Sequence, residues 1–134
     1  MVDAGVLERC HTVEESYERM LAFAARGLPA PPPGGDAEIR DLLSRAAGAV
    51  DGLPGRYARA VQELGLVPAA PHLDFLPVLE RDAAAALGVL RLALAQPSIG
   101  SQLVDDLNAS LHLRALLTDL FLLGGVLRAR AGRG

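Results

Sequence analysis

The chain has 134 residues, of which 51% are hydrophobic and 22% charged, and its formal net charge is −3. This length and composition predict one globular domain spanning residues 1–134, with a core of its own, and exclude the disordered class. The acidic balance argues against general attraction to nucleic acid or to an anionic membrane surface.

The first two predicted helices are set by start and stop signals. Thr12 and Glu15 have the spacing of a capping box, so the first helix is expected to begin there and to end at Gly27, with no more than a short extra turn in the preceding residues Val2 to Arg9. A connection rich in proline and glycine follows over residues 28–35. Asp36 is then the expected cap of a second helix that reaches the Asp51-Gly52 pair.

Two more helices follow along the chain. A short one is predicted over 54–64, and a second proline-rich connection occupies residues 65–73. Asp74 is the expected cap of the next helix, since Leu73 and Val78 are placed as a hydrophobic staple around it. Pro77 is tolerated in the first turn of such a helix. Pro97 ends this helix. Its expected inner face consists of Leu79, Ala83, Ala86, Leu87, Leu90 and Leu94.

The last predicted helix runs from Gln102 to Arg130 without interruption. Ten of the 17 residues from Leu111 to Leu127 are Leu, Phe or Val, so this part is apolar on nearly every side. A helix of that kind has to be enclosed. The sequence therefore predicts an all-α fold: an antiparallel bundle of four main helices and one short helix, with the C-terminal helix at the core or at a dimer interface.

The amount of apolar surface on that helix favours a homodimer. It carries 13 large apolar side chains between Leu103 and Leu127. Exposing half of them would forgo roughly 10–20 kcal/mol, which is comparable to the entire stability of a typical domain. Enclosure in the centre of one chain is the alternative that the sequence leaves open.

Composition also limits the chemistry. All 13 basic residues are arginine, so a Schiff base to lysine and a P-loop phosphate site are excluded. Cys10 is the single cysteine, which excludes an internal disulfide and a cysteine-rich zinc site. Neither a cofactor nor a metal is expected. The residue usage is typical of a GC-rich bacterial genome, and the lack of a signal peptide or a membrane span predicts a cytoplasmic protein.

Most candidate site residues fall on two polar lines of the predicted C-terminal helix. One contains His112 and Asp119 and is either the solvent-facing strip or a proton-transfer pair. The other lies among apolar residues and contains Arg114, which would then need a buried acid such as Asp82 as its partner. The catalytic candidates are therefore His112, Asp119 and Asp82, and the ligand-binding candidates are Arg114, Asp106, Thr118, Phe121 and Tyr17.

Two classes of function remain open from the sequence. The first is a small dimeric helical protein that binds an apolar molecule, a peptide or a partner helix in a groove between helices. The second is a cofactor-free tailoring enzyme of bacterial specialised metabolism, for example one that cross-links peptides through lysinoalanine, with a pocket lined by Arg, Asp and His. Recognisable catalytic motifs that would decide between them are absent from the sequence.

Overall fold

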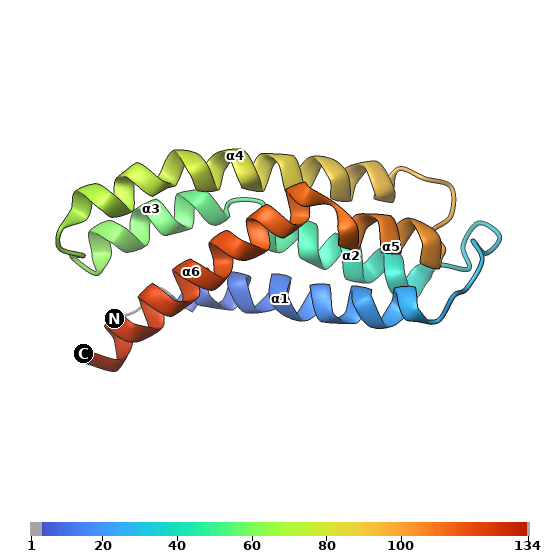
Figure 1. Ribbon diagram of the computed structural model, residues 1–134, viewed down its shortest axis with the longest axis horizontal. Helices are drawn as coiled ribbons and strands as arrows, with labels where there is room; N and C mark the ends of the chain where they lie inside the picture. The colour runs from blue at the N-terminus through green and yellow to red at the C-terminus, as the bar shows by residue number, and fades with distance from the viewer. Residues whose placement is uncertain (1–3, 134) are drawn as a thin grey trace.

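The computed structural model describes residues 4–133, and these form six helices and no strand (Figure 1). The helices are α1 (Ala4–Ala25), α2 (Ala37–Val50), α3 (Leu53–Glu63), α4 (Ala69–Leu94), α5 (Ser101–Ala109) and α6 (Leu111–Arg133). The all-α class is therefore confirmed. The expected number of helices is wrong, because the C-terminal helix is two helices.

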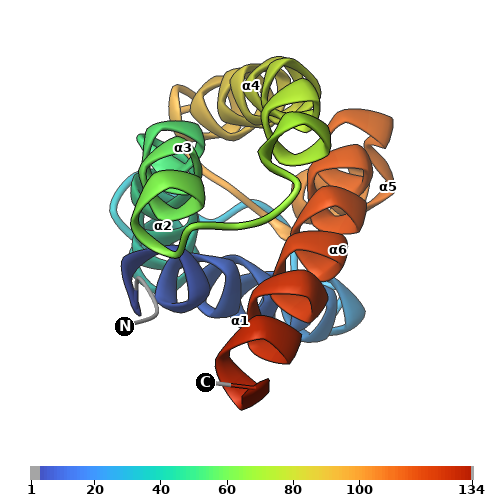
Figure 2. The ribbon, with the colours of Figure 1, turned by 90° about the vertical axis from the view of Figure 1, so that its left-hand side faces the viewer.

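Viewed along its length, the molecule has four sides (Figure 2). α1 forms one side and α4 the opposite one, while α2 with α3 and α5 with α6 form the other two. The space between the sides is filled by apolar side chains from every helix, and the largest fully buried ones include Tyr57, Met20, Ile39 and Leu116. Two of the four sides are thus each made by consecutive helices.

The break between α5 and α6 falls at Ser110, whose backbone is extended, and the two helices are bent by 58°. Asn108, just before the break, is buried and donates from its side-chain amide to the carbonyl of Met20 at 3.2 Å. Polar side chains such as Asn and Ser compete with the backbone for hydrogen bonds and favour helix ends. The prediction of one continuous helix over 102–130 is therefore corrected.

Two predicted helix starts are also wrong. α1 begins at least eight residues before Thr12, whose hydroxyl donates instead to the carbonyl of Glu8, one turn earlier in the same helix. α4 begins at Ala69, so Asp74 lies within the helix and Pro77 is in its interior. α2 and α3 match the prediction to within a residue at most ends, and Asp41 and Arg45, four residues apart on α2, form an ion pair.

The connection before α2 is anchored to the start of α5. The amide of Leu28 donates to the hydroxyl of Ser101, and the amide of Ser101 donates to the carbonyl of Leu28. A side chain at Gly100 would lie 2.6 Å from the backbone nitrogen of Ala30, so only glycine allows this close approach. These contacts fix the end of the molecule at which α4 and α5 are joined.

No single helix among the described residues is long and apolar enough to cross a membrane, and α5 and α6 meet that criterion only when taken together across their bend.

Candidate functional site

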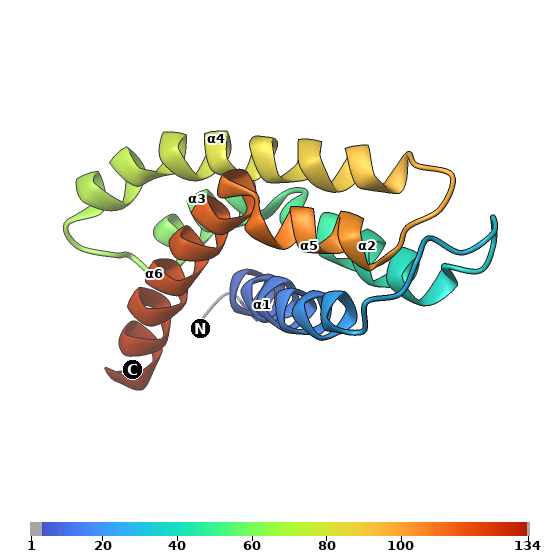
Figure 3. The same cartoon turned by 45° about the vertical axis from the view of Figure 1, so that its right-hand side comes forward.

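An open groove of about 480 Å³ lies between the C-terminal half of α4 and α5. The two helices are joined by the loop over residues 95–100 (Figure 3). Most of the lining is apolar, and the residues are Val89, Leu92, Ala93, Gln96, Pro97, Ser98, Leu103, Asp106, Leu107 and Ser110. The exposed fraction of Leu92 is 66%, so an apolar side chain stands at the groove with little protein cover.

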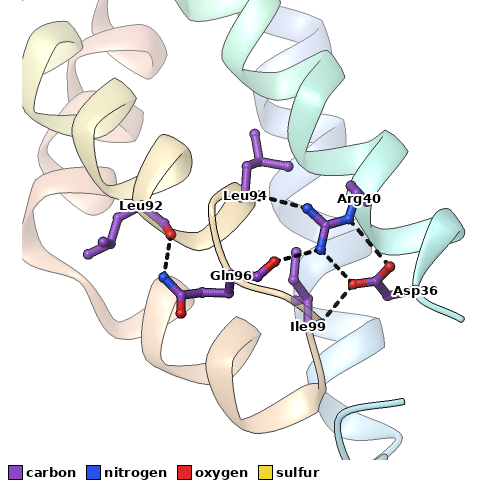
Figure 4. Close-up of polar contacts among 6 residues, drawn as sticks. All are labelled: Asp36, Arg40, Leu92, Leu94, Gln96 and Ile99. Atoms are coloured by element: carbon purple, nitrogen blue, oxygen red, sulfur yellow. Dashed lines mark hydrogen bonds and ion pairs between the residues drawn. The ribbon is translucent and has the colours of Figure 1, made fainter. Parts of the chain in front are cut away.

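The end of α4 beside this groove is fixed by a clamp of Asp36 and Arg40 (Figure 4). Arg40 donates to both carboxylate oxygens of Asp36, at 2.8 and 3.3 Å, and to the carbonyls of Leu94 and Gln96, at 2.6 and 2.9 Å. Asp36 also accepts the amide of Ile99 at 2.9 Å. The arginine therefore satisfies carbonyls at the C-terminus of α4, which would otherwise have no partner in the helix.

Asp36 was expected to cap α2 with its side chain, and this expectation is wrong. This residue occupies the N-cap position of α2, but its side chain makes no capping hydrogen bond there. It is buried, and its hydrogen bonds to Arg40 hold its pKa below the ordinary value for aspartate. Its carboxylate instead joins α2 to the loop that forms one end of the groove.

The groove carries little charge. Among the described residues that line it, Asp106 is the one with a charged side chain, and Gln102 donates to that carboxylate at 3.0 Å from the preceding turn of α5. Ser98, Ser110 and Gln96 supply the remaining polar groups of the lining. The groove can therefore cover an apolar molecule and accept hydrogen bonds from it, but its side chains offer no cation to an anionic group.

A second, smaller hollow of about 240 Å³ lies at the other end of α4, between α3, α4 and α6. Tyr57 is 1% exposed there, donates from its hydroxyl to the carbonyl of His72 at 3.1 Å, and meets Phe75 edge-on. Leu122 and Val126 of α6 complete the hollow and are 59% and 43% exposed. The hollow is apolar and extends onto the open face of α6.

Between these two cavities, α4 and α6 bring Asp82 and Asp119 together. The pKa of Asp119 is raised to about 7, first by burial and then by the hydrogen bond and negative charge of Asp82, while Arg81 opposes this shift. Arg81 Nε lies 3.8 Å from Asp82 Oδ1. One oxygen of Asp119, Oδ2, is buried without a hydrogen-bond partner. A carboxyl in this setting can gain or lose a proton near neutral pH.

The other predicted residues of α6 do not join this pair. Arg114 is exposed, so the expectation of a buried arginine paired with Asp82 is wrong. His112 and Thr118 are also exposed, and the hydroxyl of Thr118 donates to the carbonyl of Arg114. Asp119, expected together with His112 on a solvent-facing or proton-transfer line, is 7% exposed and belongs to the contact with α4.

Three ligand-binding candidates lie in three different places. Asp106 lines the groove between α4 and α5. Phe121 is 58% exposed on α6. Tyr17 is half-buried on α1, where its hydroxyl donates to the carbonyl of Asn108 at 3.4 Å. The structure therefore does not bring the predicted ligand-binding residues into one site.

Sequence reasoning missed the α4 side of the groove. The predicted inner face of this helix contains Leu79, Ala86 and Leu90, which are buried. Val89 and Leu92 form a second apolar line that was not distinguished from the core. The available signal was that α4 has more apolar residues than one buried face requires.

Nucleophilic and metal chemistry find little support in the described residues. Cys10 is buried, and burial together with the nearby charge of Glu14 raises the pKa of its thiol to about 11, so the reactive thiolate is scarce at neutral pH. Within residues 4–133, no group of three or more His, Cys, Asp or Glu side chains is placed to hold a metal ion.

Searches against protein families, curated proteins and solved structures gave no match to this chain.

Proposed function

We propose that this protein is a helical-bundle binding protein that holds a small, mostly apolar molecule in the groove between α4 and α5. The observation that carries the proposal is the groove itself, with its volume of about 480 Å³ and its apolar lining. Ligand sites for small molecules are typically about 300–1,000 Å³, mostly apolar, with a few polar groups that fix orientation.

The lining narrows the chemistry of the molecule. A neutral ligand, or one with a cationic or hydrogen-bond-donating group, suits a groove in which Asp106 is the charged side chain within the described part of the chain. The hydroxyls of Ser98 and Ser110 provide further acceptors. An anionic ligand would meet the Asp106 carboxylate without a compensating arginine. A peptide or a partner helix is the alternative occupant, and mass spectrometry of the purified protein distinguishes either one from a small molecule.

Binding of a neutral fluorescent probe, N-phenyl-1-naphthylamine, tests the proposal. Leu92→Arg introduces a long charged side chain at the groove, and it should weaken probe binding about tenfold or more, the equivalent of one lost apolar contact. Leu21→Arg is the matched control, because Leu21 is an exposed leucine on α1, 46% exposed and outside the groove. Equal affinities of the two variants would refute the groove as the binding site.

Mass spectrometry of the purified protein then identifies the natural class of ligand. A retained small molecule that Leu92→Arg loses and Leu21→Arg keeps supports the proposal. A retained peptide with the same dependence would assign the groove to peptide recognition instead.

The proposed binding protein is a homodimer. α6 leaves Phe121, Leu122 and Val126 substantially exposed along one part of its surface, next to the second hollow. Eight of the 13 apolar side chains that led to the dimer expectation are buried within the single chain. A second copy covering this face would remove three of those that stay exposed from water. Analytical ultracentrifugation checks this: the wild-type chain should sediment as a dimer and Leu122→Arg as a monomer, whereas a monomeric wild type would refute it.

A tailoring enzyme is the second candidate, and the pairing of Asp82 with Asp119 is the observation that favours it. Two carboxyls in contact, one with its pKa raised to about 7, are suited to general acid–base chemistry. Neither carboxyl lines the groove, which is why binding is preferred. Conversion of a retained molecule by the wild type, lost in Asp119→Asn without loss of binding, would favour the enzyme.

A further inference from the structure

The contact between Asp82 and Asp119 lies on the same face of α4 as both cavities. Phe75, Asp82, Val89 and Gln96 follow one another at intervals of seven residues, so they share one side of the helix. Phe75 lines the second hollow, and Val89 and Gln96 line the groove. Asp82 is thus the one carboxylate among these four residues, and on this side of α4 it lies between the residue that lines the hollow and those that line the groove.

The two carboxyls are sheltered from water. Asp119 is 7% exposed, and the side chain of Asp82 is 17% exposed. Among the described residues, the charged groups that act on Asp119 are Asp82 and Arg81, both on α4. α1, α2, α3 and α5 contribute no charge to it within that part of the chain. A single proton therefore decides whether this contact is a hydrogen bond or a repulsion between like charges.

We propose that Asp82 and Asp119 form a proton-operated latch between α4 and α6, closed by a shared proton and loosened when that proton is lost. In the closed state the protonated carboxyl donates to its ionised neighbour. In the open state both groups are ionised, and they separate until water reaches the Asp119 oxygen that has no partner when the latch is closed.

The surrounding packing limits the size of the movement. Leu113, Leu116, Leu120, Leu123 and Leu127 of α6 are buried to at least 97%, so loss of one proton cannot release the helix from the core. Opening is confined to the crossing of α4 and α6. α6 starts at the extended Ser110, and this break allows it to tilt without moving α5.

The tilt has a consequence for ligand binding that rests on the proposed function. Ser110 is at once the link between α5 and α6 and a lining residue of the groove. A change in the angle of α6 therefore reaches the groove at this residue. Protonation of the latch would then alter the affinity of the groove for its ligand.

Amide hydrogen exchange between pH 5 and 8, corrected for the intrinsic rate, tests the latch without any ligand. Amides 116–123 are hydrogen-bonded within α6 and exchange only by local unfolding, which costs less free energy once the contact with α4 is loosened. The opening equilibrium of these amides in the wild type should therefore rise several-fold per pH unit, with tenfold as the ceiling for one proton, and level off above about pH 7. Asp119→Asn keeps a hydrogen-bonding group without the charge, and its profile should be flat. Asp74→Asn, which removes an exposed carboxylate of α4, should retain the wild-type profile.

An opening equilibrium that does not change with pH in the wild type would overturn the proposal. A rise with pH that is also present in Asp119→Asn would overturn it as well. Carbon-13 titration of the wild-type carboxyls is the second measurement and does not depend on a variant that folds. An Asp119 resonance that titrates near pH 7 supports the latch, and one that titrates below pH 5 overturns it. Failure of probe binding to the groove would leave both results intact, so the latch and the proposed function fail separately.

Discussion

Replacing two leucines of α6 by alanine tests whether this helix is seated on the core as the structure has it. Leu116 and Leu122 lie six residues apart on the same helix, and their exposed fractions are 0% and 59%. The chemical change is identical in both variants, so any difference between them reports the surroundings of the side chain.

The expected losses differ by several-fold. Leu116→Ala removes a fully buried side chain and leaves a cavity, which costs about 3–5 kcal/mol of the free energy of unfolding. Leu122→Ala removes atoms that are mostly in contact with water within one chain, so the expected loss is below about 0.5 kcal/mol. The first loss is a large part of the roughly 5–15 kcal/mol that stabilises a typical domain.

Urea unfolding followed by far-ultraviolet circular dichroism measures both free energies, at a protein concentration low enough for each chain to be alone. The slopes against urea should match the wild type, so that the midpoints report stability. Losses within about 0.5 kcal/mol of each other would refute the placement of α6. A loss in Leu122→Ala that grows with protein concentration would instead locate this leucine at the proposed dimer interface.

Three further outcomes are expected. Cys10, buried and with its thiol pKa raised to about 11, should react with iodoacetamide at pH 8 only as fast as the protein unfolds, and rapid labelling of the native protein would contradict its placement. Arg40→Ala should destabilise the fold at neutral pH. Because Arg40 lowers the pKa of Asp36, that contribution is present above the ordinary aspartate pKa and is lost as the pH falls through the lowered one. Acid titration should therefore show a smaller loss of stability in Arg40→Ala than in the wild type, and equal losses would count against the clamp. Tyr57→Phe leaves the carbonyl of His72 without its donor and should cost about 1–2 kcal/mol in thermal unfolding, whereas an unchanged midpoint would show that water replaces the hydroxyl.

Local signals predicted the bounds of α2 and α3 better than the starts of α1 and α4. α2 and α3 lie between Asp36, Gly52 and Gly65, residues whose conformational preferences stop a helix on either side. Thr12 and Asp74 have the same chemistry as helix caps, yet each lies inside a helix. A cap motif shows where a helix can begin, and only packing against α2 or α3 decides that it begins earlier.

The candidate site was less predictable because its residues were placed on one straight helix. The 58° bend at Ser110 separates the polar residues of α5 from those of α6, so the two predicted lines do not continue through it. His112 and Asp119 do share a face of α6, but α4 covers that face only at Asp119. The burial of Asp119 therefore depends on the crossing of α4 and α6, which no local pattern in the sequence predicts.

Two arginines each tie one helix to the C-terminal end of another. The guanidinium of Arg9, on α1, donates to carbonyls of Gly48, Ala49 and Asp51 at the end of α2. Arg40, on α2, does the same at the end of α4. Each of these hydrogen bonds forms only when the last turn of the accepting helix is folded. Neither the arginine's own helix nor the accepting helix can therefore make the contact by itself. The consequence is that α1, α2 and α4 assemble cooperatively. Because the guanidinium group keeps its positive charge in alkali, these hydrogen bonds persist at pH values at which a lysine side chain would lose its proton and its charge.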